Sequence, residues 1–184
     1  MARKKENSNF EFVENSTLRE NLDIVFDHIV ELLSLSESSQ YDRVLKSSFR
    51  KTTIIHTAAI IEELLLYKLK KHKTVEECAS FKTEFKIEQK LELDEERIVA
   101  VGKYKTTRDK FQFNKANLDQ VNKLCKEFEL ISEDMFRNVD SVREQRNRQH
   151  VGGLQEIDYE YTKEELQYVF DVARDVKNQV REAI

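Results

Sequence analysis

The sequence predicts an all-α fold, an up-and-down bundle of helices with an insertion around residues 72–113. The 184-residue chain contains no proline and only 3 glycines, the residues that interrupt helices most strongly. Charged residues make up 36% of the chain and hydrophobic residues 39%, and apolar positions recur every three to four residues along most of it. We therefore expect a polar N-terminal tail over residues 1–15 and a single helical domain over residues 16–184.

The first helix is expected to begin at Thr17, because Thr17 and Glu20 have the spacing of a capping box. The serine-rich segment 34–39 then predicts a turn. Between these signals, apolar residues with helical spacing predict one core-facing side: Leu18, Leu22, Val25, Phe26, Ile29, Leu32 and Leu33.

The second helix is expected to run over residues 41–71. Its middle, residues 54–66, is apolar almost all round, which is typical of a helix at the centre of a bundle or in an oligomer interface. His56 lies in this stretch and is expected to be a core histidine or to lie at a dimer interface. Glu62 is expected to be exposed or to form an ion pair. Glu63 is a candidate for supporting a cation from across the bundle.

Residues 72–113 depart from the helical pattern. Phe81, Phe85 and Ile87 have a spacing that suits a short helix. Residues 97–107 carry β-branched side chains in alternation around a glycine, which predicts either a small β-hairpin or a loop–helix insertion. An insertion of this length in a compact bundle usually serves a purpose such as contact with a partner.

Three further helices are expected in the C-terminal half of the chain. The first covers residues 115–129. The second follows Ser132, a capping residue with acids in the next turn, and ends at the glycines 152–153. The third begins near Thr162, where Thr162 and Glu165 have the spacing of a second capping box.

Composition narrows the class of protein. The formal net charge of −4 argues against a protein that coats nucleic acid without specificity. Cys78 and Cys125 are isolated thiols, which fits a reducing cytoplasm better than a disulfide framework. The N-terminus lacks the apolar stretch of a signal peptide, and no run approaches the ~18 apolar residues of a membrane span. The four histidines lack partners at ligand spacing. We expect a cytoplasmic protein with no membrane contact and with neither metal nor other cofactor.

The most informative segment is residues 142–153, at the end of the helix that follows Ser132. An α-helix turns by roughly 100° per residue, so His150 lies within about 20° of Arg143 and about 40° of Arg146 around the axis. Asn147 is on the same side. Cations, an amide and a titratable imidazole together are suited to binding a phosphate and moving a proton beside it. These four residues are the candidate catalytic residues.

With this motif, the chain resembles the HEPN superfamily of small helical-bundle domains. The resemblance rests on Arg143 and His150, which six residues separate, on the pair Arg146 and Asn147, and on a long apolar helix that precedes the motif helix. Many HEPN domains are metal-independent ribonucleases whose active site forms where two protomers meet. The resemblance implies a homodimer that binds and cleaves RNA in a defence or toxin–antitoxin system, with an antitoxin or another protein as partner.

The resemblance also implies a role for each residue. RNA supplies its own nucleophile, the ribose 2′-OH, so catalysis needs proton transfer and stabilisation of the charge on the phosphorane. His150 would act as general base or acid. Arg143 or Arg146 would bind the scissile phosphate, and Asn147 would orient the imidazole or the phosphate. Glu63 would support the motif arginine from the second helix.

Other interpretations of these residues remain. A charged helix end is often a solvated face whose cations complement the helix dipole. A non-catalytic HEPN-like module could bind a nucleotide, a nucleic acid or a protein partner through the same groove, and a helical adaptor could dimerise through the second helix. Tyr159 and Tyr161 could stack on a base, although packing against the bundle suits them better.

Overall fold

The computed structural model describes residues 8–92, 98–148 and 160–182. The chain divides into two compact units, one within residues 1–71 and 117–184 and the other within residues 72–116. The first unit is helical and the second contains a two-stranded antiparallel sheet, which confirms a mostly helical chain with a hairpin insertion. The elements are α1 (Ser16–Glu37), α2 (Arg43–His72), β1 (Ser80–Glu92), β2 (Ile98–Asp109), the 3₁₀ helix η1 (Phe113–Lys115), α3 (Leu118–Glu127), α4 (Glu133–Asn147) and α5 (Lys163–Glu182).

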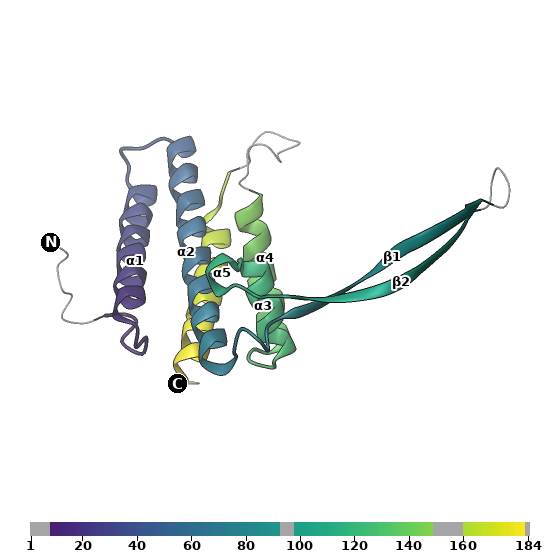
Figure 1. Ribbon diagram of the computed structural model, residues 1–184. Coiled ribbons are helices and arrows are strands. Elements are labelled where there is room, and N and C mark those ends of the chain that lie inside the picture. Colours follow the sequence, from purple (N-terminus) through teal and green to yellow (C-terminus); the bar gives the residue numbers. More distant parts are fainter. Residues whose placement is uncertain (1–7, 93–97, 149–159, 183–184) are drawn as a thin grey trace. The chain divides into compact units, whose positions relative to one another are not determined.

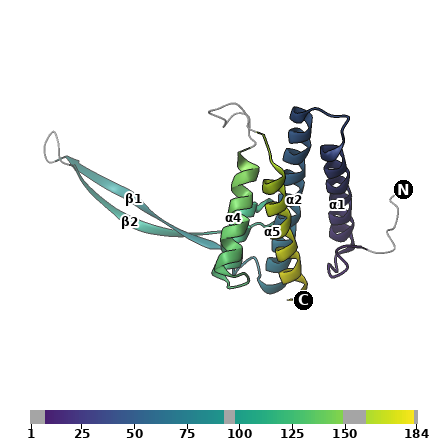
Figure 2. The same ribbon diagram turned by 180° about the vertical axis from the view of Figure 1, so that it is seen from behind.

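The long helices of the first unit run alternately up and down. In Figure 1 the chain rises along α1, descends along α2, rises along α4 and descends along α5. Figure 2 shows the same four helices from behind, with α5 now in front. The shorter helix α3 packs against α4. This is the up-and-down arrangement that the helical periodicity predicted.

The core of this unit is built around α2. Its buried positions lie on nearly all sides of the helix, as expected for a helix at the centre of a bundle. The other helices contribute narrower apolar stripes, so each keeps a solvated face. The fully buried residues include Ile54, Ile61, Leu64, Leu65 and Leu69 of α2, Val121 of α3, Val139 and Val142 of α4, and Val169, Val176 and Val180 of α5.

The segment before α1 is part of the core, so the prediction of a polar tail over residues 1–15 is wrong for its described part. Phe10 and Val13 are buried. The backbone there is also held by side chains of the bundle. The Asn9 N–H donates to Asp23 at 3.1 Å, and the Glu14 N–H donates to the Tyr67 hydroxyl at 3.2 Å. The three apolar residues of this segment, Phe10, Phe12 and Val13, were too few to produce a periodic signal.

Both ends of α1 differ from the prediction. The N-cap is Asn15, whose side chain accepts the Leu18 N–H at 2.9 Å, so Thr17 lies inside the first turn. At the other end, the helix continues through the first serines of segment 34–39. Ser36 is buried, and its hydroxyl donates to the Leu33 carbonyl at 2.8 Å. A serine that bonds back to its own helix in this way does not end it.

The N-caps of α4 and α5 were predicted correctly, but α4 ends at Asn147 with Arg148 as its C-cap, before the glycines 152–153 at which its end was expected. The Ser132 side chain accepts the Met135 N–H at 3.2 Å. Thr162 and Glu165 form the reciprocal capping box, because each side chain accepts the other residue's backbone N–H. Helix α3 is shorter than predicted, because Asn117 caps it and residues 113–115 form a separate 3₁₀ turn.

The insertion is a β-hairpin, which decides between the two alternatives. Strands β1 and β2 pair from Ser80 opposite Asp109 to Glu92 opposite Ile98, with a bulge between Ile87 and Gln89. The short helix expected over residues 81–87 is therefore wrong. Phe81, Phe85 and Ile87 are also separated by even numbers of positions, which places them on one face of a strand. Pairing with β2 decides between the helical and the strand interpretation.

Within the hairpin, one glycine permits a close approach of the two strands. Gly102 is paired with Ile87, and a Cβ atom at Gly102 would lie 2.2 Å from the carbonyl oxygen of Lys86. Any other residue would force the backbone to shift at this point. Two pairs farther along, the rings of Phe85 and Tyr104 lie opposite each other with centroids 5.1 Å apart.

In the described part of the chain, helices are too short or too polar to cross a membrane. No cluster of metal-ligating side chains is found among these same residues. Cys78 and Cys125 are both buried, and the Cys125 thiol donates to the Leu65 carbonyl at 3.7 Å. Both cysteines are therefore kept away from solvent.

Candidate functional site

Helix α4 is anchored by Val139 and Val142, which are fully buried. The motif side chains leave the helix beside this stripe and border an open hollow of about 630 Å³. Three of the four predicted residues, Arg143, Arg146 and Asn147, thus come together. The lining comprises Ile55 from α2, Asn117, Leu118 and Asp119 from the start of α3, and Arg143, Arg146 and Asn147 from α4.

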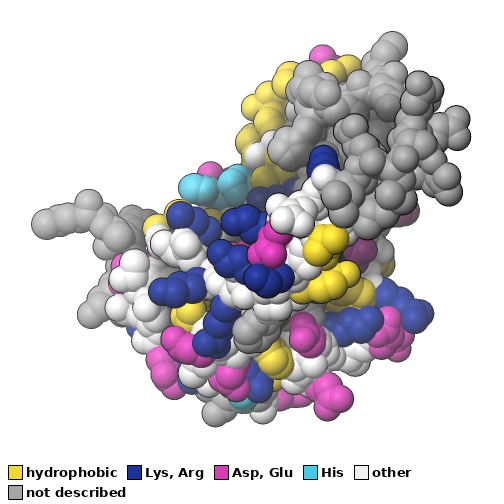
Figure 3. Space-filling view, turned by 45° about the vertical axis from the view of Figure 1, so that its right-hand side comes forward, with side chains coloured by type: hydrophobic (Ala, Val, Ile, Leu, Met, Phe, Trp, Pro, Cys, Tyr) yellow, Lys and Arg dark blue, Asp and Glu magenta, His cyan; other side chains and the backbone are white. Residues whose placement is uncertain are grey.

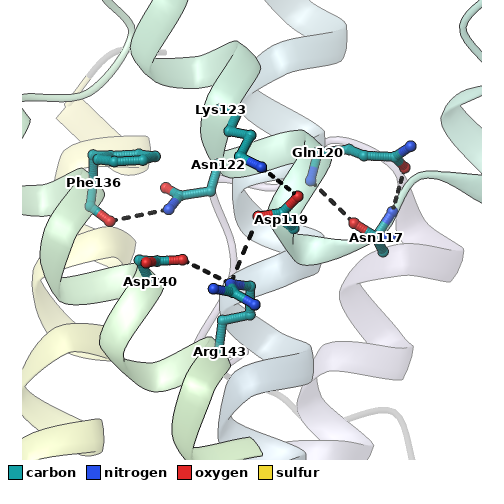
Figure 4. A network of polar contacts seen from close by, with 8 residues as sticks. All are labelled: Asn117, Asp119, Gln120, Asn122, Lys123, Phe136, Asp140 and Arg143. Carbon is teal, nitrogen blue, oxygen red and sulfur yellow. Dashed lines mark hydrogen bonds and ion pairs between the residues drawn. The ribbon is translucent and has the colours of Figure 1, made fainter. Parts of the chain in front are cut away.

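Arg143 is held by two aspartates. Its Nε donates to Asp140 Oδ1 at 2.7 Å, one turn earlier on α4, and lies 3.7 Å from Asp119 Oδ1 on α3. The hydrogen bond to Asp140 is the main cause that raises the pKa of the Arg143 guanidinium. Figure 4 shows the contacts of that nitrogen with Asp140 and with Asp119. The guanidinium is therefore fixed in position at the wall of the hollow.

The start of α3 is itself well ordered by hydrogen bonds. Asn117 and Gln120 form a reciprocal capping box, with distances of 3.0 and 3.2 Å. Asp119 also pairs with Lys123 at 2.8 Å. Asn122 is buried, and its side-chain amide donates to the Phe136 carbonyl at 3.0 Å, which joins α3 to α4 (Figure 4). These contacts hold Asn117 and Asp119 in place opposite the motif helix.

Arg146 is held from α2. Its Nη1 donates to Glu62 Oε2 at 2.7 Å, and the Glu62 side chain is only 18% exposed. Glu62 is thus the ion-pair partner that one of the sequence alternatives described. The structure places Glu63, expected in the supporting role, about 100° farther round α2. There it lines a smaller hollow with α1 residues, and partial burial raises the pKa of its carboxyl.

The fourth predicted residue, His150, lies outside the described residues, as do Tyr159 and the glycines at 152–153. Helix α4 ends at Asn147, and Arg148 is its C-cap. His150 follows three positions after Asn147 along the chain.

Two other residues singled out in the sequence belong to the packing of the bundle. Tyr161 is buried, and its N–H donates to the Ser47 hydroxyl at 2.9 Å, so the packing interpretation is confirmed for it. His56 is partly buried, with its ring centroid 6.1 Å from that of His28 on α1. Burial is the main cause that lowers the pKa of His56.

The site contains acids that the sequence analysis missed. Asp140 could have been found, because it lies three residues before Arg143 and therefore on the same side of the helix. Asp119 could not, because only the packing of α3 beside α4 brings it to the arginine. Over the face drawn in Figure 3, Lys and Arg side chains lie next to Asp and Glu side chains. The hollow, with its fixed arginines, is therefore a more specific candidate than the surface charge.

The arrangement presents two guanidinium groups, two amides and one carboxylate to a single hollow. Such groups can bind an oxyanion through charge-assisted hydrogen bonds, while the carboxylate restricts which part of a ligand fits there. Comparisons of the chain with protein families, curated proteins and solved structures gave no match.

Proposed function

We propose that the hollow at the end of α4 binds the phosphodiester backbone of RNA, and that the protein is a metal-independent endoribonuclease of the HEPN type. The observation that carries this proposal is the gathering of Arg143, Arg146 and Asn147 around one hollow of about 630 Å³. A volume of this size admits a nucleotide-sized ligand. The resemblance of the motif to HEPN domains supports the choice of RNA as that ligand.

The ion pairs leave room for a phosphate to bind. Among the described residues, Asp140 and Asp119 form ion pairs with Arg143 through its Nε, so its two terminal nitrogens can still donate to an oxyanion. Within the described ranges, Glu62 contacts Arg146 through Nη1, so Nε and Nη2 can also donate to an oxyanion. A guanidinium that carboxylates already hold in position loses less freedom when it binds a phosphate bidentately.

In the proposed reaction, the 2′-oxygen attacks the adjacent phosphorus as its proton passes to a base, and the bond to the 5′-oxygen breaks as that oxygen receives a proton. His150 is the proposed base or acid. The arginines stabilise the additional negative charge of the phosphorane, and Asn147 orients the phosphate or the imidazole. The products are a cyclic phosphate and a 5′-hydroxyl, and the 5′-oxygen receives either the proton that His150 took from the 2′-oxygen or one from water.

By the same resemblance, we propose that the active form is a homodimer in which each protomer contributes its motif. A defence or toxin–antitoxin role, with an antitoxin or another protein that inhibits the activity, belongs to this proposal. A cytoplasmic location is proposed with it, because RNA is the substrate.

The test is RNA cleavage by the purified protein in the presence of EDTA. We expect His150→Ala to lower the rate by about 10²-fold or more, and Arg143→Ala or Arg146→Ala to lower it by a similar factor. Arg137→Ala is the matched control, because Arg137 is an exposed arginine of α4 that pairs with Glu133. Full activity of His150→Ala and of the double variant Arg143→Ala/Arg146→Ala would refute the assigned site.

The second candidate is a non-catalytic module that binds a nucleotide, a nucleic acid or a protein partner in this hollow. The specific observation in its favour is the pairing of both arginines with acids, since Asp119 and Glu62 oppose the approach of a phosphate. Binding without cleavage, weakened steeply by salt and strengthened by Glu62→Gln, would identify a phosphate-binding module. Binding that salt does not affect would identify an apolar protein partner.

A further inference from the structure

A second concave site lies in the helical unit, among α1, α2, α5 and the segment that precedes α1. It is a groove of about 380 Å³, which is within the range of small-molecule pockets. The groove shares no residue with the hollow at α4. Its walls are mainly apolar, and their apolar residues include Phe10, Phe26, Ile29, Leu33, Ile60 and Phe170.

The charged residues of the groove carry one more positive than negative charge. Asp171 is satisfied within α5, where it accepts from Arg174 at 2.9 Å and from Gln167 at 3.2 Å. The third charged residue is Lys177, whose ammonium lies 5.2 Å from the centroid of the Phe10 ring. In the described parts of the chain, no carboxylate forms an ion pair with Lys177.

The surroundings of Lys177 disfavour its charged form. Partial burial is the main cause that lowers its pKa. Asp23 is the acid that acts on it electrostatically, but the Asp23 carboxylate accepts the N–H of Asn9 at 3.1 Å. A ligand carboxylate at this point would give Lys177 a direct ion-pair partner, in addition to the electrostatic attraction of Asp23.

We propose that this groove binds a small amphipathic monocarboxylate, with a medium-chain fatty acid as the simplest member of the class. The carboxylate lies at Lys177 and the hydrocarbon tail lies against the partly exposed rings of Phe26 and Phe170. The single excess positive charge of the walls matches one carboxylate. The proposal is independent of RNA binding, because it uses none of the residues of the hollow at α4.

The apolar walls distinguish this ligand from the other occupants of a groove. A purely polar anion would leave the phenylalanine surface wetted, so it gains nothing from the walls. A helix from a second copy of the chain would cover Lys177 and would have to bring an acid to it. A fatty acid places a carboxylate at Lys177 and a hydrocarbon chain against the apolar walls, so one molecule suits both the charged and the apolar part of the groove.

The test is isothermal titration of the whole protein with decanoate, and with decanol as the matched ligand without a charge. We expect decanoate to bind and decanol to bind about tenfold more weakly, because a hydrogen bond to a charged group is lost. Lys177→Gln should weaken decanoate by about the same factor and leave decanol unchanged. Ala173→Leu, which adds bulk to the groove wall, should weaken both ligands.

Two control variants accompany these titrations. Lys163→Gln removes an exposed lysine from the same helix and should leave binding unchanged. Lys177→Arg keeps the charge and should retain decanoate, so the assignment can be tested even if the glutamine variant does not fold. Equal binding of decanoate and decanol would overturn the proposal. Absence of decanoate binding would also overturn it. If the protein then self-associates and Ala173→Leu abolishes that association, the occupant of the groove is a second copy of the chain.

Discussion

The helical unit and the hairpin differ in how far their apolar side chains are buried. Leu64 and Leu65 at the centre of the bundle have no solvent exposure, whereas Phe85 and Tyr104 of the hairpin are 44% and 76% exposed. Burial of a leucine contributes about 1.5–3 kcal/mol, but a cross-strand aromatic pair on an open sheet contributes only about 0.2–1 kcal/mol. Similar apolar content thus gives a stable core in one unit and a weakly stabilised ribbon in the other.

Backbone hydrogen bonding adds to this difference. A helix satisfies its interior N–H and C=O groups within one segment, whereas a two-stranded sheet leaves two edges unpaired. A two-stranded hairpin is at best marginally stable on its own in water. We therefore expect substitutions to have large, cooperative effects in the bundle and local effects in the hairpin.

The largest effect is expected from Leu64→Ala. The substitution leaves a cavity in a fully buried position of α2, so we expect a loss of about 2–5 kcal/mol in the free energy of unfolding. Urea denaturation followed by circular dichroism at helical wavelengths measures it. Tyr104→Ala is the comparison in the hairpin, with an expected loss below about 1 kcal/mol. Equal losses in the two variants would contradict the distinction between the units.

A smaller and local effect is expected from Gly102→Ala. The new Cβ would lie 2.2 Å from a backbone oxygen of the opposite strand, so the strands must move apart. We expect the hairpin to lose about 1–3 kcal/mol of stability while the bundle keeps its unfolding midpoint. Amide hydrogen exchange resolves the two units. Val101→Ala is the control, and unchanged exchange in the hairpin of Gly102→Ala would show that the close approach is not required.

The smallest effect is expected from His56 of α2, whose ring centroid lies 6.1 Å from that of His28. Because the pKa of His56 is lowered in the folded state, the unfolded state binds more protons as the pH falls. The associated stability is complete above the unfolded pKa near 6.5 and is lost as the pH falls through the folded pKa. We expect a loss below about 1 kcal/mol between about pH 7.5 and about pH 5.5.

Thermal unfolding of the wild type and of His56→Gln across this pH range measures the effect. The glutamine variant should show a flatter dependence on pH, because it lacks the titrating group. A steeper dependence in the variant would mean that other groups determine the response to pH.

The contrast between the two units also explains what could be predicted from sequence. Helical periodicity and local caps such as Ser132 and Thr162 are properties of a few neighbouring residues, so the bundle helices were foreseeable. The start of α1 was misplaced because Asn15 and Thr17 are both capping residues, and packing of the preceding segment selects Asn15. The strand of residues 80–92 depends on a partner that lies later in the chain.

In the candidate site, too, features set by one helix could be predicted from sequence, and features set by packing between helices could not. The gathering of Arg143, Arg146 and Asn147 follows from the geometry of one helix and was foreseeable. The choice of Glu62 over Glu63 as the partner of Arg146 depends on how α2 is rotated within the bundle. Asp119 is more remote still, because α3 must pack beside α4 before it can reach the site.

The register of the hairpin makes it a removable module. Ser80 is paired with Asp109, so the chain enters and leaves the ribbon at one place. Opposite residues of an antiparallel pair have Cα atoms about 4.5–5.5 Å apart, a gap that a tight turn closes. Shortening or exchanging residues 81–108 is therefore a change in one connection of the chain, and arms of different length or sequence are compatible with the same pair of end residues.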